Sequence, residues 1–367
     1  MGGRARRLGG RGQNQIREAT MGTLRRDVLR WLGLGAAMTA AAPGGAWGDR
    51  IRILPGAQGG ERAGTPGKTS PELAALLVSV RADQIQRHGV LSVLWLHAKA
   101  PAPGFEVTTL EEARAQSTLR IMEREQATVP ELIVENQGAS SVLLLAGEIL
   151  LGGKQNRVLT EDVLLPPMSG PRELGVYCVE QGRWAGGRTT FESRGTFAAP
   201  ALRSRLMAKA PQAQVWAEVD RYSRLAYAAS PTQSYQQVYE QPEVRDHVKS
   251  VERAIDLKAA SGAHGAAVFV AETLAGLDLF QDAGLFAREW PKLLSAYAVE
   301  TYRGADQPGG DERRLRKALT ELLRSASSVE GTLRTNAGVG QLFEFRAGKH
   351  RGASLTFKGS VVHAAIL

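Results

Sequence analysis

The pattern of apolar and polar residues changes about halfway along the chain. Residues 72–200 contain short apolar runs broken by Gly and Asn, a pattern typical of strands. The run GVLSVLWLHA at 89–98 predicts one buried strand, and residues 174–180 predict another. The runs at 132–134 and 142–145 flank a turn-prone Asn-Gln-Gly group, which predicts a β-hairpin. We therefore expect an antiparallel sandwich or a strongly twisted sheet in this half.

Apolar residues of the second half recur at spacings of three and four, as they do on one face of a helix. The segment EVRDHVKSVERAID at 243–256 shows this period. Between the predicted helices, residues 266–270 predict a buried strand, which turns at Gly276 into a second, short strand. Asp278 follows among apolar residues, and we expect it to cap the next helix rather than to act in catalysis.

Strand patterns at both ends of the chain, with helical patterns between them, predict an α+β protein. We expect a single α+β domain over residues 72–367. It consists of an antiparallel β-rich part at 72–200, a helix-rich part at 201–330 and a C-terminal β-meander at 338–367. The meander is expected to complete the first sheet. Residues 49–71 are rich in Gly, Pro and Arg and predict a disordered linker.

Residues 1–48 have the pattern of an export signal with an upstream extension. The stretch RRDVLR at 25–30 resembles the twin-arginine motif, and the moderately apolar residues 31–42 are too few to span a bilayer stably. Small residues before Asp49 predict cleavage there, and a cut near Ala42 is the alternative. We expect a periplasmic or secreted protein that uses the twin-arginine export machinery and has no stable membrane anchor. An uncleaved amphipathic helix is the competing interpretation.

The basic composition belongs mainly to this leader. The chain has 367 residues and a formal net charge of +9. Residues 1–70 hold 12 Lys and Arg against 4 Asp and Glu, so they carry +8 and the rest of the chain carries +1. A nearly neutral remainder does not indicate a nucleic-acid partner. The chain has one cysteine, so it forms no intramolecular disulfide.

The stretch LLLAGEILLGGKQNRVL at 143–159 contains a candidate ligand-binding turn. A nucleotide phosphate loop is excluded because its glycine spacing is absent and Gln155 stands where Ser or Thr is required. What remains is a two-glycine turn whose donors and acceptors suit a polar, anionic ligand. The candidate ligand-binding residues here are Lys154, Gln155, Asn156 and Arg157. A solvated turn between two strands is the alternative.

Two carboxylates near such segments are candidates for catalysis. Glu148 interrupts an apolar run, and a buried carboxylate there needs a cation or hydrogen-bond donors, for which Lys154 and Arg157 of the turn are the candidates. Glu180 lies in the segment CVEQGRW at 178–184, which ends a predicted strand. Beside it, Arg183 and Trp184 are candidate ligand-binding residues, because a guanidinium and an indole suit a flat, polar ligand. A local ion pair, with the indole as a lid on the core, is the alternative.

Nucleophilic and metal chemistry have weaker support. Cys178 is a candidate nucleophile, but a cysteine packed in the core is the favoured interpretation because no histidine lies near it in the sequence. No metal site is expected, since the six histidines are scattered and no paired-cysteine motif or acidic cluster with ligand spacing occurs. No motif identifies a cofactor, which stays unknown.

Together, GE–GGKQNR and CVEQGRW, followed by GLDLF and WPKLLSAYA, resemble the ARG-and-rhodanese-phosphatase-superfamily-associated protein domain, an uncharacterised prokaryotic family. The resemblance covers about residues 72–302 and implies a fold more firmly than a reaction. The family name refers to genomic association with ADP-ribosylglycohydrolases, which implies a nucleotide- or ADP-ribose-related ligand by association only. The export signal argues against an intracellular role in NAD metabolism. The matching positions are Gly147, Glu148, Lys154, Gln155, Asn156, Arg157, Cys178, Glu180, Arg183 and Trp184.

Two functions fit these features, and they leave open whether the chain is an enzyme. In the first, the chain binds or acts on a polar, anionic small molecule. Lys154, Arg157 and Arg183 then hold the anion, while Glu148 or Glu180 orients it or acts as a general base. In the second, the chain is a periplasmic structural or interaction domain in which these residues form an internal ion-pair network. Convergence of Glu148, Arg157, Glu180 and Arg183 on an open concavity favours the first function. Internal pairing of these residues without an accessible pocket, or wide separation of them, rules out the first function as stated.

Overall fold

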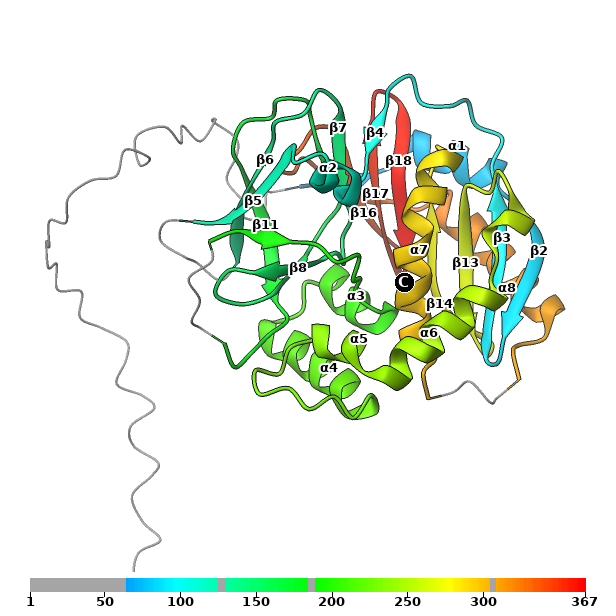
Figure 1. Cartoon of the computed structure of the whole chain (residues 1–367). Coiled ribbons are helices and arrows are strands. Elements are labelled where there is room, and N and C mark those ends of the chain that lie inside the picture. Colours follow the sequence, from blue (N-terminus) through cyan, green and yellow to red (C-terminus); the bar gives the residue numbers. More distant parts are fainter. Residues whose placement is uncertain (1–63, 125–129, 184–188, 304–307) are drawn as a thin grey trace, which may run out of the picture. The chain divides into compact units, whose positions relative to one another are not determined.

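The structure, a computed structural model, describes residues 64–124, 130–183, 189–303 and 308–367. The chain divides into two units, residues 1–50 and 51–367, and every described residue lies in the second. The predicted export signal and the candidate Trp184 lie outside the described residues. Helices, antiparallel sheets and a C-terminal strand meander together confirm the predicted α+β class (Figure 1).

The largest sheet unites strands from both ends of the described chain. Its strands are β1 (Thr65–Lys68), β2 (Arg81–His88), β3 (Leu91–His97), β13 (Gly265–Val270), β14 (Thr273–Leu279), β15 (Gly331–Arg334), β16 (Gln341–Ala347), β17 (His350–Phe357) and β18 (Ser360–Ile366). Their order is β1-β15-β16-β17-β18-β14-β13-β3-β2, and all neighbours are antiparallel. The C-terminal meander therefore shares a sheet with β2 and β3.

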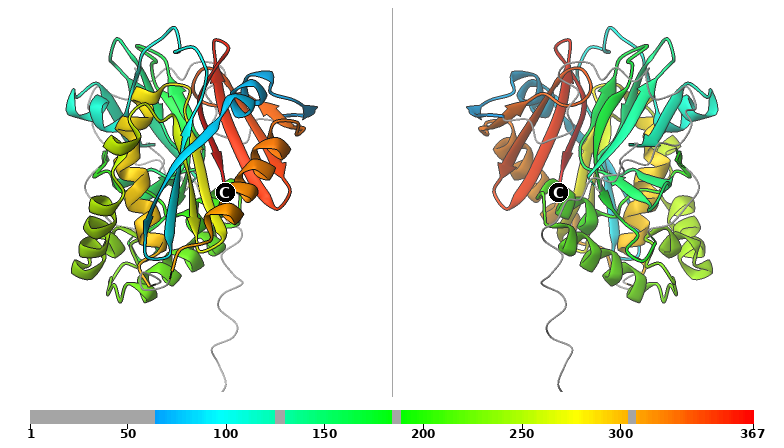
Figure 2. Two further views of the ribbon diagram at one scale, coloured as in Figure 1. Left: turned by 90° about the vertical axis from the view of Figure 1, so that its right-hand side faces the viewer. Right: turned by 90° about the vertical axis from the view of Figure 1, so that its left-hand side faces the viewer.

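Strand β3 shows why this sheet has helices on both faces. Residues 91–96 are all buried, and successive side chains point to opposite faces. Val93 and Trp95 pack with helices α6 and α7, whereas Leu94 and Leu96 pack with α1 and α8. Figure 2 shows helices on both sides of this sheet. These four helices are α1 (Pro71–Ser79), α6 (Pro242–Ala254), α7 (Ala283–Glu300) and α8 (Glu312–Ala326).

Two smaller sheets form a sandwich beside the large one. Their strands are β4 (Val107–Thr108), β5 (Leu119–Glu123), β6 (Glu131–Asn136), β7 (Ser141–Leu144), β8 (Ile149–Gly152), β9 (Arg157–Leu159), β10 (Val163–Leu165), β11 (Arg172–Cys178) and β12 (Phe191–Glu192). The orders are β12-β8-β9-β11-β6-β5 and β10-β7-β4. Apolar side chains of both sheets, such as Val134 and Leu144, share one buried core.

The predicted hairpin between residues 132–134 and 142–145 is wrong. β6 pairs with β5 and β11, whereas β7 pairs with β4 and β10 in the other sheet. The buried Asn136 amide donates hydrogen bonds to the carbonyl oxygens of Ser140 and Pro166, at 2.8 and 2.9 Å. These bonds hold the connection as a crossover between the sheets instead of a tight turn.

The remaining helices are α2 (Leu110–Ala115), α3 (Pro200–Met207), α4 (Gln212–Leu225) and α5 (Gln236–Glu240). Helix α7 is capped by Asp282, whose carboxylate accepts hydrogen bonds from the backbone N–H groups of Gly284 and Leu285. Asp278 therefore does not cap this helix, contrary to the prediction, and lies buried within β14. The predicted turn at Gly276 is also wrong, because Gly276 pairs with Val268 inside the β13–β14 ladder.

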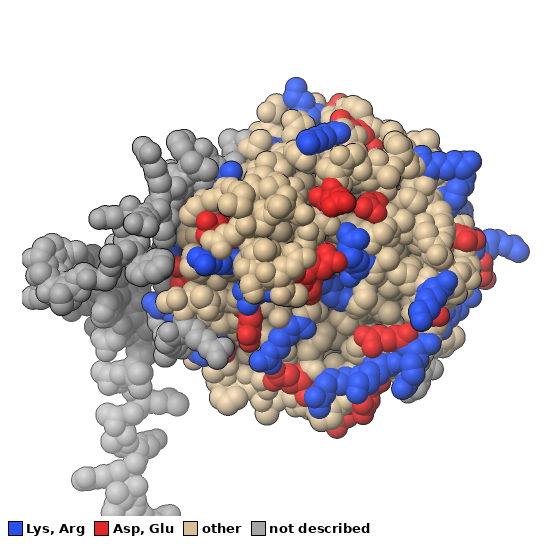
Figure 3. Space-filling view, turned by 45° about the horizontal axis from the view of Figure 1, so that its top comes forward, with Lys and Arg blue, Asp and Glu red and all other residues tan. Residues whose placement is uncertain are grey.

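The fold begins before the end of the segment that was predicted as a linker. Strand β1 begins at Thr65, so the last residues of that segment belong to the fold. Among the described helices, none combines the length and the apolar character that crossing a membrane requires. On the face drawn in Figure 3, basic and acidic side chains are interspersed over the described part of the surface.

Candidate functional site

The two-glycine turn connects strands β8 and β9, as the sequence predicts. Gly152 and Gly153 have φ angles of +140° and +51°. A Cβ atom at Gly153 would lie 2.3 Å from the Phe191 ring and 2.4 Å from Glu123 Oε1. The backbone conformation and this close packing explain both glycines without a bound phosphate.

Arg183 joins this turn to the second candidate segment. Its guanidinium donates hydrogen bonds to the carbonyl oxygens of both turn glycines, at 3.2 and 2.7 Å, and to Glu180 Oε2 at 2.7 Å. Glu180 also accepts from the backbone N–H of Asn156 at 3.0 Å and from Thr232 Oγ1 at 2.6 Å. Burial opposes the ionisation of Glu180, but these donors outweigh it and lower the pKa of its carboxyl. The two segments therefore face one another and pair directly.

The other candidates of these segments lie behind this pair. Arg157 is fully buried, with Nη1 donating to the Gln155 carbonyl oxygen at 3.0 Å and Nη2 lying 3.6 Å from Glu123 Oε1. The Cys178 thiol is also fully buried and donates to Gln155 Oε1 at 3.0 Å. Burial raises the pKa of this thiol even though Arg157 lowers it. A protonated, enclosed thiol fits the interpretation of a core cysteine. Lys154 donates its backbone N–H to Glu123 Oε1 at 3.0 Å.

Glu148 lies in a separate buried cluster. Its side chain is 1% exposed, and its Oε1 contacts the ammonium group of Lys292 on α7. The carboxylates of Glu111 and Glu289 contact the same ammonium group, at 3.0 and 2.6 Å. Burial raises the pKa of Glu148 well above its usual range, although Lys292 lowers it. The cation that the sequence predicts for a buried Glu148 is present, but it comes from α7 and not from the turn.

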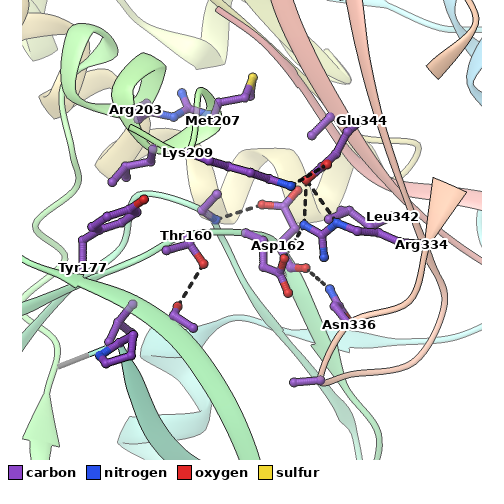
Figure 4. A pocket seen from close by; sticks show the side chains of 18 of the residues that line it. Thr160, Asp162, Tyr177, Arg203, Met207, Lys209, Arg334, Asn336, Leu342 and Glu344 are labelled. Carbon is purple, nitrogen blue, oxygen red and sulfur yellow. Dashed lines mark hydrogen bonds and ion pairs between the residues drawn. The ribbon is translucent and has the colours of Figure 1, made fainter. Parts of the chain in front are cut away.

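A pocket with a volume of about 420 Å³ lies where the sandwich meets the large sheet. Its walls come from β11, the β9–β10 connection, the end of α3, and β16 with the segment that precedes it. Tyr177 lies on one side, Arg334 and Glu344 lie on the other, and Lys209 extends toward Glu344 (Figure 4). Among the described residues, the candidates of the two segments do not line this pocket, and neither does Glu148. Trp184 lies outside the described residues.

Arg334 is the central charged group of the pocket wall. Its side chain is 6% exposed, and Nη2 pairs with Glu344 Oε1 at 2.6 Å and with Glu161. Lys209 Nζ lies 3.1 Å from Glu344 Oε2. Burial raises the pKa of Glu161 despite Arg334, whereas at Glu344 the cations outweigh burial and lower the pKa. Cationic donors and carboxylate acceptors therefore line one wall.

Behind this wall, charged groups of alternating sign cross the interior. Asp162 Oδ2 accepts a hydrogen bond from His363 Nδ1 at 2.7 Å, and His363 Nε2 lies 3.2 Å from Asp278 Oδ1. Arg203 donates two hydrogen bonds to Asp278, at 2.6 and 3.0 Å, and the Tyr297 hydroxyl donates a third at 2.6 Å. All five side chains are nearly or completely buried. Asp162 and Arg203 also line the pocket, so this network fixes part of its wall.

The protonation state of His363 follows from its neighbours. Burial alone would lower the pKa of an imidazole, but the two flanking carboxylates outweigh it and raise the pKa of His363 to about 9. The imidazole is therefore charged at neutral pH and donates from both nitrogens. Counted at their formal charges, the two carboxylates and the two cationic side chains of this network sum to zero. Pairing of opposite charges with hydrogen bonds reduces the cost of burying them.

Sequence reasoning missed the pocket because its residues come from distant segments. One signal was present: Asp278 in GLDLF and His363 in SVVHAAIL each interrupt an apolar strand, as Glu148 does. A polar residue in such a strand is rarely buried without partners. Reading these interruptions together would have identified the network, although not the pocket beside it.

The comparisons with known proteins bear on the family. A family model described as the ARG and Rhodanese-Phosphatase-superfamily-associated Protein domain matches residues 79–367. No curated protein and no solved structure matches the chain. The matched region contains both candidate segments, the pocket residues and the buried network. The chain therefore belongs to the family of the ARG and Rhodanese-Phosphatase-superfamily-associated Protein domain.

Proposed function

We propose that this chain binds a polar, anionic small molecule in the pocket between Tyr177 and Arg334. The pocket itself carries the proposal, since its volume of about 420 Å³ lies in the range of small-molecule sites and charged groups converge in it. A nucleotide- or ADP-ribose-related compound, which the family name implies by association, belongs to this ligand class. The proposal concerns binding and assigns no reaction.

The chemistry of one wall supports this ligand class. A guanidinium has five N–H donors, and Arg334 directs Nε and Nη2 to Glu161 and Glu344, so Nη1 lies outside these bonds. The Lys209 side chain is 45% exposed and adds a second, more accessible cation. Both cations suit a phosphate or carboxylate. Glu161 and Glu344 can accept hydrogen bonds from ligand hydroxyl groups.

The backbone of Lys209 is consistent with a role at this position. The residue follows the end of α3 with a φ angle of +52°. Glycine is the usual residue in this left-handed conformation, because a Cβ atom is unfavourable there. Lysine at such a position carries a side chain across the pocket to Glu344, which glycine could not supply.

A thermal-shift screen with nucleotides, sugar phosphates and carboxylates tests this proposal. We expect at least one compound to raise the melting temperature, because ligand at about 100 times its Kd adds about 2.7 kcal/mol of stability. The shift should fall by half or more in Lys209→Gln. The matched control is Arg346→Gln, which removes one positive charge from an exposed position on β16 outside the pocket. An equal loss in both variants, or no loss in Lys209→Gln, would contradict the proposal.

A second candidate function is a structural or interaction domain without a ligand. The pairing of Arg183 with Glu180 and with the turn favours it, because these motif residues satisfy one another internally. This pairing explains the motifs but not the pocket, which is why we place binding first. The same screen separates the two functions, since a purely structural domain predicts no stabilisation by any of the compounds.

We also propose that the chain is exported by the twin-arginine route, on the basis of the RRDVLR stretch at 25–30. The test is cell fractionation of the full chain in a bacterium that has this machinery. We expect the protein in the periplasmic fraction, shortened by cleavage. The double variant Arg25→Lys, Arg26→Lys should remain uncleaved in the cytoplasm. If both forms have the same length and location, this proposal fails.

A further inference from the structure

Three carboxylates from separate elements meet in the interior. Glu111 comes from α2, Glu148 from the β7–β8 connection and Glu289 from α7. One carboxylate oxygen of each lies within 4.8 Å of the others. Glu148 and Glu289 are 1% and 0% exposed, whereas the Glu111 side chain is 40% exposed and reaches the surface. The cluster is therefore buried on two sides and open on the third.

Some carboxylate oxygens of this cluster accept no hydrogen bond, and the formal charges of the cluster do not sum to zero. Lys292 provides one positive charge to three carboxylates, which leaves a net charge of −2 when all four groups are ionised. Glu289 is fully buried; its Oε2 lies 2.6 Å from the Lys292 ammonium nitrogen, but its Oε1 accepts no hydrogen bond. Oε2 of Glu148 accepts none either. Burying carboxylate oxygens without donors is unfavourable, so this arrangement needs additional positive charge.

We propose that Glu111, Glu148 and Glu289 bind one divalent cation through the oxygens that Lys292 leaves without a hydrogen bond. A single divalent cation brings the charge of the cluster to zero. Carboxylate oxygens are the ligands of Mg²⁺, Mn²⁺ and Ca²⁺, and nitrogen or sulfur ligands that would select zinc are not part of the cluster. The exposed Glu111 gives the ion a route from solvent. Bound there, the ion joins α2, α7 and the β7–β8 connection.

This inference differs from the sequence prediction of no metal and goes beyond the proposed small-molecule site. Sequence motifs show metal ligands that lie close together in the chain, whereas these three come from distant segments. The competing explanation is that protons neutralise the cluster. In agreement with either explanation, burial raises the pKa of Glu148 and of Glu289. Only a direct measurement of metal binding separates them.

The test is calorimetric titration of the full chain with MnCl₂ after treatment with EDTA. We expect one Mn²⁺ ion per chain, displaced by Mg²⁺ or Ca²⁺. Glu289→Gln and Glu111→Gln should each weaken Mn²⁺ binding by at least the roughly tenfold that loss of an outer-sphere partner costs. The matched control is Glu112→Gln, on the same helix, whose carboxylate pairs with Arg288 and not with Lys292. This variant should bind Mn²⁺ as the unaltered chain does.

Two results would overturn the inference. One is no binding of Mn²⁺, Mg²⁺ or Ca²⁺ at roughly 10⁻³ M, the weak end of protein calcium sites; neutralisation by protons predicts this result. The other is unchanged Mn²⁺ affinity in both Glu289→Gln and Glu111→Gln. If Glu289→Gln does not fold, Glu111→Gln still tests the inference, because the Glu111 side chain is 40% exposed and its replacement disturbs the core less.

Discussion

Replacement of Arg203 with leucine is expected to lower the free energy of unfolding by about 3–5 kcal/mol. Arg203 is 4% exposed and donates two hydrogen bonds to the fully buried Asp278. Without it, the carboxylates of Asp162 and Asp278 share a single cation, His363, and one buried negative charge has no partner. Removing one member of a buried ion pair is costly for this reason. Urea unfolding, followed by tryptophan fluorescence, measures the loss.

The matched control is Arg205→Leu on the same helix. The Arg205 side chain is 51% exposed, and its Nε lies 3.4 Å from Glu218 Oε2. Exposed pairs of this kind contribute up to about 1 kcal/mol, so this variant should remain close to the unaltered protein. Similar losses in the two variants would show that the buried network has no special role in stability.

Stability is also expected to fall between pH 6.5 and pH 9. The pKa of His363 is about 9 in the folded protein, above the ordinary value of about 6.5 that applies after unfolding. The folded state therefore holds this proton more tightly. Its contribution is complete below about pH 6.5 and is lost as the pH rises through 9, and the difference corresponds to roughly 3 kcal/mol.

The comparison that isolates this effect is His363→Gln, measured by urea unfolding at several pH values. The groups that face the imidazole are Asp162 and Asp278, with Arg203 and Tyr297 bound to Asp278. Burial lowers the pKa values of His247, His264 and His350, so in the folded state they titrate at lower pH than His363. The variant should be less stable at pH 6.5 and should lose the His363 part of the slope. Parallel pH profiles for the two proteins would contradict the assignment.

The sequence predicted a helix or strand correctly where the apolar residues of that element follow a clear local pattern. Continuous apolar runs located β3 and β13, and the spacing of three and four located α6. The sheet to which each strand belongs was less predictable. Asn136, in a turn-prone group, predicts a hairpin, but its side chain bonds to Ser140 and Pro166 and directs the chain into the other sheet. Such long-range contacts leave no local pattern in the sequence.

In the candidate site, too, local pairs were predictable from the sequence, whereas contacts between distant segments were not. The sequence left a Glu180–Arg183 ion pair as the alternative to a ligand site, and this pair occurs. It also marked Glu148 as a carboxylate in need of a cation or donors, but the cation is Lys292 and not Lys154 or Arg157. It could not show that Lys292, 144 residues further along the chain, provides that cation. The pocket was hidden for the same reason, since Arg334 and Glu161 meet only after the sandwich packs against the large sheet.

The central claim is that a ligand binds in the pocket and not at the two-glycine turn. A crystal structure of the protein with the compound that stabilises it most in the thermal-shift screen tests this most directly. The account predicts the compound between Tyr177 and Arg334, with its anionic group against Lys209 or Arg334. A compound bound instead at the Gly152–Arg157 turn, with the pocket unchanged, would contradict it.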